Sequence, residues 1–258
     1  MLGRQEGDPL DPVRYPKAAL DRIKATIGTW QFSTLYQQRP VPREGSIFKR
    51  SWFGSDKRVR VAPVEAKVVR GWDLASSVKK RSKYTAGVRL SMDNQGVVYI
   101  EHALRFREGP GQVEKMIHAV SKQDKAERPQ IRISIPQDPG QAAKSQVLAF
   151  TKLLHGFDVR FSPESGEKTD RANPFSAQCE GGNVRIIETG SLLRDAWIEP
   201  FLDELCGFPG GEFSDQTDAT SRAYTGLLEM NDPVETYMFL DQVGVGGPEE
   251  GGYYGSSD

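Results

Sequence analysis

The chain has 258 residues, a formal net charge of −1 and 37% hydrophobic residues, enough for one large domain or two small ones with a buried core. No apolar run approaches the roughly 18 residues of a membrane span, and the N-terminus lacks the apolar stretch of a secretory signal, so we expect a soluble protein without membrane contacts. Two cysteines without CxxC spacing and three scattered histidines disfavour disulfides, zinc and histidine catalysis, and favour a reduced, cytoplasmic protein.

Charge is distributed unevenly along the chain. Residues 57–89 contain ten basic side chains and two acidic ones, whereas from residue 199 onward there are thirteen acids and one base. A basic run is as often a solvated face as a surface that binds a polyanion. We therefore expect the two ends of the chain to meet different partners.

The first 65 residues are predicted to be a linker segment that packs on the next domain and contributes no strand. Three breakers, Asp8-Pro9, Asp11-Pro12 and Tyr15-Pro16, come first. A stripe of apolar residues then predicts a helix over 17–34.

The centre of the chain alternates between strand and helix patterns. Period-two alternation predicts an antiparallel meander of strands at 66–75, 84–92 and 97–105. After Gly109-Pro110-Gly111 the pattern predicts a helix, a strand over 131–135 that stops at Pro136, a helix with Ala143, Val147, Phe150 and Leu154 on its apolar face, and a strand over 158–162. The fold class is therefore α/β, a mixed sheet of order βββαβαβ flanked by helices.

The remaining elements complete a domain that we place at residues 66–243. We expect helical structure around 168–178, a strand at 184–187, a helix over 191–205, a break at 207–211 and a last helix over 214–228. Residues 244–258 contain six glycines, which predicts a flexible tail.

Two carboxylates adjoin predicted strands. Asp73 lies in an apolar strand, where an unpaired carboxylate would cost several kcal/mol, so a basic side chain or a metal ion must compensate it. Asp138 directly follows the strand over 131–135, at the strand end where open α/β sheets place their sites. Because Asp138 also precedes Pro139-Gly140, an ordinary turn is the alternative.

Two further acids open the last helix, on one face and three residues apart: Asp215 and Asp218. Their alternative role is helix capping. An acid in the first strand, one after the fourth and one on a late helix together form an RNase H-like pattern. Such a pattern suits two Mg²⁺ or Mn²⁺ ions, because these hard cations take oxygen ligands and stabilise both the attacking and the leaving oxygen of a phosphodiester.

The sequence also resembles a known family, the C-terminal nuclease half of the large terminase subunit of tailed double-stranded DNA bacteriophages. The resemblance covers roughly residues 30–228. The blocks that carry it are Phe32 to Pro40 with Phe48-Lys49-Arg50-Ser51-Trp52-Phe53, Gly71-Trp72-Asp73-Leu74-Ala75, Tyr84-Thr85-Ala86-Gly87, Pro136-Gln137-Asp138-Pro139-Gly140, Lys168 to Ala172 with Phe175, Gly182-Asn183-Val184, Phe201-Leu202-Asp203-Glu204-Leu205, and Phe208 to Gly211 leading into Asp215-Gln216-Thr217-Asp218-Ala219.

The resemblance implies a metal-dependent endonuclease that cuts concatemeric viral DNA during genome packaging. Its implied partners are double-stranded DNA, the packaging ATPase domain, the portal and the small terminase subunit, in the host cell cytoplasm at the portal vertex of the procapsid. The residues assigned to this chemistry are Asp73, Asp138 and Asp215 as catalytic metal ligands, Asp218 as a further metal-site acid, either a ligand or a residue that supports the ligands and orients a bound water, and Lys144, Lys168 and Arg171 as DNA contacts.

The chain departs from the family pattern at two places near these acids. Many members have His-Asp-Asp where this chain has Phe213-Ser214-Asp215, and an acid where it has Lys83. No GxxxxGK[ST] motif is present, so we expect no packaging ATPase domain and a monomeric nuclease, either an isolated domain or the product of a split gene. Two alternatives stay open: a non-catalytic module that docks to the portal, and another RNase H-like nuclease such as a resolvase.

Overall fold

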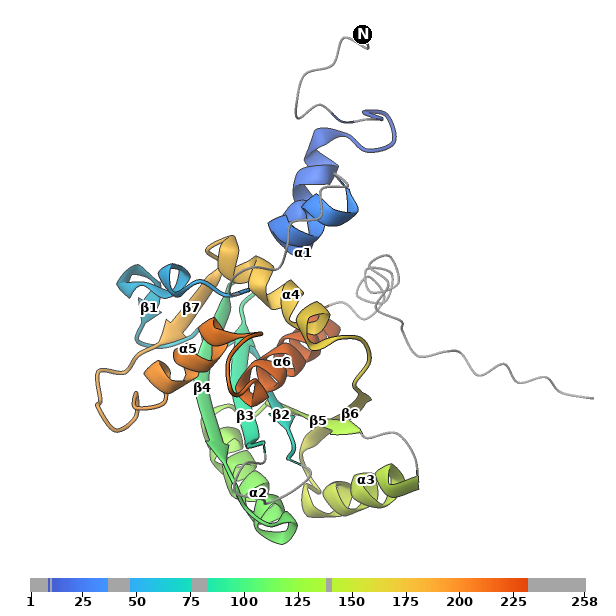
Figure 1. Cartoon of the computed structure of the whole chain (residues 1–258). Helices are drawn as coiled ribbons and strands as arrows, with labels where there is room; N and C mark the ends of the chain where they lie inside the picture. Colours follow the sequence, from blue (N-terminus) through green and yellow to red (C-terminus); the bar gives the residue numbers. More distant parts are fainter. Residues whose placement is uncertain (1–8, 10, 37–46, 76–82, 138–140, 232–258) are drawn as a thin grey trace, which may run out of the picture.

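A computed structural model of the chain describes residues 9, 11–36, 47–75, 83–137 and 141–231. Within them, seven strands form one mixed sheet of order β1-β7-β4-β3-β2-β5-β6 (Figure 1). The strands are β1 (Arg58–Val59), β2 (Lys67–Asp73), β3 (Thr85–Met92), β4 (Val98–Phe106), β5 (Arg132–Gln137), β6 (Asp158–Pro163) and β7 (Val184–Ile187). The α-helices are α1 (Lys17–Leu35), α2 (Pro110–Glu127), α3 (Gln141–Leu153), α4 (Lys168–Glu180), α5 (Ile198–Gly207) and α6 (Asp215–Asn231).

The strand pairings confirm the predicted order. Strands β2, β3 and β4 form the antiparallel meander, and β5 and β6 run parallel to β2. Because parallel strands end at the same edge of a sheet, the carboxyl ends of β2, β5 and β6 share one edge. The sequence predicts Asp73 and Asp138 at the ends of β2 and β5, and therefore at this edge.

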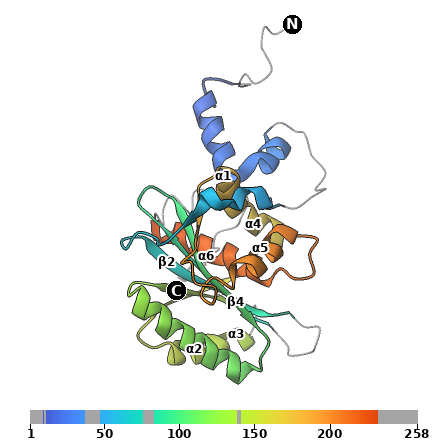
Figure 2. The same ribbon diagram turned by 90° about the vertical axis from the view of Figure 1, so that its left-hand side faces the viewer.

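Helices cover both faces of the sheet (Figures 1 and 2). Helices α4, α5 and α6 pack on one face, here called the α6 face, where the larger apolar core includes Val69, Val88 and Phe201. Helices α2 and α3 cover the opposite α2 face, where a smaller core forms around Trp72 and Ile133. In β2, odd-numbered residues therefore point to the α6 face and even-numbered ones to the α2 face.

Glycine at position 71 lets α6 lie directly on β2. A Cβ at Gly71 would lie 2.4 Å from the carbonyl oxygen of Ala219 and 2.5 Å from the backbone nitrogen of Ala223, both in α6. No other residue type fits without moving this helix. Since Asp215 lies one turn before Ala219 and Asp73 follows Gly71 on the same face, this contact sets the spacing of the two acids.

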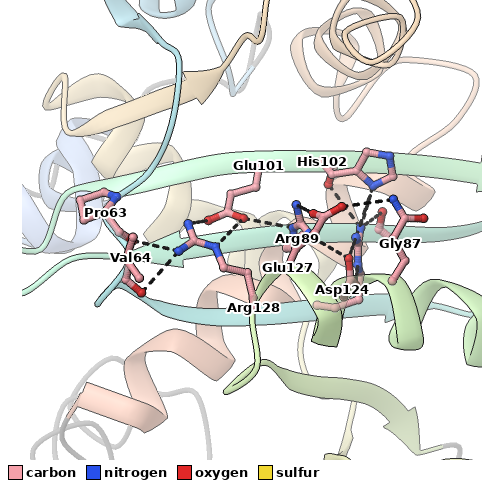
Figure 3. A network of polar contacts seen from close by, with 11 residues as sticks. Pro63, Val64, Gly87, Arg89, Glu101, His102, Asp124, Glu127 and Arg128 are labelled. Atoms are coloured by element: carbon pink, nitrogen blue, oxygen red, sulfur yellow. Dashed lines mark hydrogen bonds and ion pairs between the residues drawn. The ribbon is translucent and has the colours of Figure 1, made fainter.

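A buried network of charges fixes helix α2 to the α2 face of the sheet (Figure 3). Arg70 of β2 donates two hydrogen bonds to Asp124 of α2, at 2.8 and 2.7 Å, and Arg89 of β3 donates to the same carboxylate at 2.7 Å. Glu101 pairs with Arg89 at 3.1 Å and with Arg128 at 2.5 Å. Two arginines of the basic segment 57–89 are thus engaged inside the protein rather than displayed to a polyanion.

The same network contains a neutral histidine. Burial, together with the nearby guanidinium groups of Arg70 and Arg89, lowers the pKa of His102 to about 3. A cavity of about 800 Å³ opens beside these residues on the α2 face, and its lining includes none of Asp73, Asp215 and Asp218. His102 is therefore a structural residue of this network, and the cavity beside it is not lined by these three acids.

Three local predictions were wrong. A two-residue strand, β1, lies within the first 65 residues, because Arg58 and Val59 extend the sheet beside β7. Strand β5 continues through Pro136, which is tolerated because pairing with β2 ends at Ser134 and leaves only one neighbour there. The helix expected over 191–205 begins only at Ile198.

The late start of α5 has a local cause. The carboxylate of Asp195 accepts hydrogen bonds from the backbone of Thr189 and Gly190 and from the Thr189 hydroxyl. Such bonds compete with helix formation. The tail predicted over 244–258 lies outside the described residues, and within the described ones no helix is long and apolar enough to cross a membrane.

Candidate active site

Two of the predicted acids come from elements that the fold holds together. Asp73 is the last residue of β2, and Asp215 is the first residue of α6. The contact of α6 with Gly71 brings the helix start to the end of the strand, and the two carboxylates are close enough for Asp215 to raise the pKa of Asp73.

Asp215 is held in a fixed position. Its side chain is almost fully buried, with 1% of the residue exposed, and its Oδ2 accepts a hydrogen bond from the backbone N–H of Tyr84 at 2.9 Å. Tyr84 directly precedes β3, so this bond joins the start of α6 to a neighbouring strand of the meander. The observed bond aims the carboxylate towards the sheet edge, which a simple capping role would not require.

A third carboxylate belongs to the same cluster and was not predicted. Glu164 directly follows β6, and it is the second largest cause of the raised pKa of Asp73, after burial. Its two oxygens pair with Arg222 at 2.7 Å and with Arg171 at 3.3 Å. Burial alone would raise the pKa of Glu164, but the hydrogen bond from Arg222 lowers it. An acid directly after a parallel strand was the available signal, the same one that selected Asp138.

Burial and repulsion from the neighbouring acids disfavour the charged form of Asp73. Its pKa is raised from 3.8 to about 7, first by burial, then by Glu164 and Asp215, against the opposing effects of Lys168 and Lys83. The surrounding lysines therefore do not compensate the carboxylate fully. This remaining negative potential is the electrostatic property that a cation site requires.

The raised pKa predicts a pH-dependent effect of Asp73→Asn on stability in the presence of EDTA. Between pH 4 and 7 the folded protein retains a proton that the unfolded chain releases, so the free energy of unfolding falls as pH rises. Asparagine does not titrate. The variant should be more stable than the wild type at pH 8, by up to about 1.4 kcal/mol for each pH unit between the two pKa values, and nearly equal at pH 4. Urea denaturation at both pH values measures this; a constant difference would contradict it.

Asp218 has a different environment from Asp215. It is 4% exposed, and its carboxylate pairs with Lys168 and, at 3.0 Å, with Arg171, both from α4. Lys168 also donates to the Ser214 hydroxyl at 3.0 Å. Two of the side chains predicted to contact DNA thus pair with a predicted site acid and join α4 to α6.

These ion pairs predict a stability loss for Asp218→Asn. Removing one partner leaves Lys168 and Arg171 beside an uncharged amide, which should cost on the order of 2 kcal/mol. Thermal unfolding measures the effect, and Lys122→Gln on the exposed surface of α2 is a control that removes a charge without removing an ion pair shown here. Equal melting temperatures of Asp218→Asn and the wild type would show that the pairs contribute nothing.

Two predicted residues remain, Asp138 and Lys144. Asp138 lies outside the described residues, immediately after β5, whose carboxyl end shares the edge of β2 and β6. Lys144 is exposed on α3, the helix layer of the α2 face. Among the described residues alone, no three acidic, histidine or cysteine side chains already form a metal-binding group.

Family comparison agrees with this architecture. Residues 70–226, well over half of the chain, match the family model described as the terminase RNaseH-like domain. This chain belongs to that family. The match begins in β2, three residues before Asp73, and ends in α6, so it contains the whole candidate site. Both the RNase H-like fold and the family predicted from the sequence are confirmed.

Solved structures with similar folds include several terminases. A human cytomegalovirus terminase nuclease domain, Mn soaked and inhibitor bound, is 12% identical, with 69% of this chain and 93% of that chain covered and a TM-score of 0.48. The large terminase nuclease of thermophilic phage G20c with bound magnesium is 13% identical, with 71% and 98% covered and a TM-score of 0.47. The HK97 bacteriophage large terminase is 11% identical, with 69% and 43% covered and a TM-score of 0.43. Among curated protein sequences, none matches the chain.

Proposed function

We propose that this terminase-family domain is a divalent-metal-dependent endonuclease that cleaves double-stranded DNA during viral genome packaging. The observation that carries the proposal is the convergence of Asp73, Glu164 and Asp215 at one sheet edge, where burial, together with repulsion from Glu164 and Asp215, raises the pKa of Asp73 to about 7. The family membership independently supports a role in packaging.

The donor set fits hard divalent cations. Carboxylate oxygens are the ligands that Mg²⁺ and Mn²⁺ prefer, and a cation would offset the charge that the lysines leave uncompensated. Asp73, Asp138 and Asp215 would hold two such ions, with Asp218 supporting the arrangement from α6. When bound, the ions supply a more acidic water and stabilise the charge that develops on the phosphate.

The protein's own residues fix the positions of these ligands. The Tyr84 N–H orients Asp215, and the ion pairs of Asp218 with Lys168 and Arg171 hold the first turn of α6 against α4. The partly exposed Lys168 and Arg171 remain proposed phosphate contacts at the rim of the site, because both lie beside the acids that would face the scissile phosphate.

The wider assignment follows from the family. We place the chain in the host cell cytoplasm, at the portal vertex of the procapsid, with the packaging ATPase domain, the portal and the small terminase subunit as partners. Double-stranded viral DNA is the substrate, and phosphate contacts of this kind carry no base information. Cleavage should therefore show no strict sequence preference.

Plasmid cleavage tests the proposal directly. Supercoiled DNA should be nicked and linearised in Mg²⁺ or Mn²⁺ and left intact in Ca²⁺ or EDTA, with activity restored when Mn²⁺ is added in excess over the chelator. Cutting that persists in EDTA would contradict metal dependence. A complete lack of cutting in Mn²⁺ by folded protein that still binds DNA would favour the non-catalytic docking module.

A further inference from the structure

A cluster of two aromatic rings and two arginines lies beside the candidate site. Tyr84 and Phe213 pack edge to face, with their ring centroids 5.1 Å apart. The guanidinium carbon of Arg107 lies 3.8 Å from the Tyr84 centroid and 5.3 Å from that of Phe213. The corresponding distances for Arg105 are 4.7 and 5.6 Å. Both arginines thus stack on one aromatic pair, and all four side chains are partly exposed.

The register of the meander explains this arrangement. Thr85 pairs with Phe106 in the antiparallel ladder, so Tyr84 lies opposite Arg107. A bulge in β4 leaves Glu101 without a partner in β3, because Arg89 pairs with His102 and Leu90 with Ile100.

The bulge changes which residues of β4 face α6. Before it, Val98 and Ile100 belong to the core of the α6 face; beyond it, Ala103 does. Arg105 and Arg107 continue the Ala103 alternation and therefore also point to the α6 face, the face of Asp73 and Asp215. Without the extra residue, both arginines would face α2.

The cluster and the candidate site are built from the same two segments. The backbone N–H of Tyr84 binds Asp215, and Phe213 lies two residues before it. Lys83 adjoins Tyr84 and acts electrostatically on Asp73. The position of the cluster is thus fixed relative to the carboxylates.

An ion pair inside the protein holds Arg105. Arg105 pairs at 2.6 Å with the buried carboxylate of Glu204, which also accepts two hydrogen bonds from Gln216 at the start of α6. This pair anchors Arg105 to the protein. Arg107 directly follows β4, two residues after Arg105 and further towards the sheet edge.

We propose that Arg107, held in place by Tyr84 and Phe213, binds a backbone phosphate of the duplex DNA that enters the site. The inference rests on the proposed nuclease function. A cluster of carboxylates repels phosphates, so a duplex needs cations beside the acids to approach them. A planar guanidinium suits phosphate, and stacking on the rings orders it before binding.

Two substitutions separate charge from structure. Arg107→Gln and Arg107→Lys both remove the planar guanidinium, but only the glutamine variant removes the charge. Affinity for a fluorescent 30-base-pair duplex is measured by anisotropy in EDTA across a range of salt concentrations. Lys122→Gln on α2, which covers the opposite face, is the control for loss of one charge.

Arg107→Gln should bind three- to tenfold more weakly and lose about one counterion from the slope of log affinity against log salt, whereas Arg107→Lys and Lys122→Gln should keep the wild-type slope. Equal slopes for Arg107→Gln and the wild type would overturn the inference, even if Mn²⁺-dependent cleavage by the wild type stands. If the slope falls as expected but the wild type never cleaves, the nuclease function fails and the DNA surface stands.

Discussion

Asp215→Asn is expected to reduce Mn²⁺-dependent DNA cleavage by more than about 100-fold while leaving the fold intact. Supporting residues around a metal typically contribute 10- to 100-fold, and a ligand contributes at least as much. The amide oxygen can still accept the hydrogen bond from the Tyr84 N–H, and Asn is as acceptable as Asp at a helix start. Asp215→Asn should therefore lower the cleavage rate without lowering the melting temperature.

Asp218→Asn is the matched comparison, because it makes the same chemical change one helical turn away. Its ion pairs with Lys168 and Arg171 predict a loss of melting temperature that Asp215→Asn does not show. If Asp215→Asn retains near-normal cleavage while Asp218→Asn loses it without destabilisation, the roles of the two acids must be exchanged.

Gly71→Ala is expected to destabilise the protein by about 3 kcal/mol or more. The added methyl group would lie within 2.5 Å of two backbone atoms of α6, and backbone cannot rotate away as a flexible side chain can. If α6 shifts to accommodate it, Asp215 moves away from Asp73, so cleavage should fall in any molecules that remain folded.

Gly111→Ala is the control for this substitution, because nothing lies within 4 Å of the added Cβ in α2. Alanine is the better helix former, so this variant should be as stable as the wild type or slightly more so. Thermal unfolding of both variants measures the difference in their stability. Equal melting temperatures for Gly71→Ala and the wild type would show that α6 does not depend on close contact with β2.

The sheet could be predicted because burial leaves a periodic signal in the sequence. In β3, the alternating residues Ala86, Val88, Leu90 and Met92 pack into the apolar core of the α6 face. The order of strands and helices then suffices for an RNase H-like fold. Features that depend on competition between local hydrogen bonds and regular structure were not predicted. The Asp195 turn shortens α5, and the short pairing of β2 with β5 lets the latter continue through Pro136.

The candidate site left a signal in the sequence at Asp73, an acid within an apolar strand, and at Asp215. Asp215 opens a helix after a glycine-rich break. Partners brought together by tertiary structure give no such signal. Pairing of Asp218 with α4 depends on how two helices cross, and the stacking of Arg107 on Tyr84 depends on a bulge that shifts alternation by one residue.

Asp73 and Asp215 are expected to bind a divalent cation together. Titration of the protein with Mn²⁺, followed by the electron paramagnetic resonance signal of the free ion, measures this without reference to cleavage. The wild type should bind Mn²⁺, and Asp73→Asn and Asp215→Asn should each bind it at least tenfold more weakly while Lys122→Gln matches the wild type. Unchanged Mn²⁺ binding in the folded Asp73→Asn and Asp215→Asn variants would contradict the account.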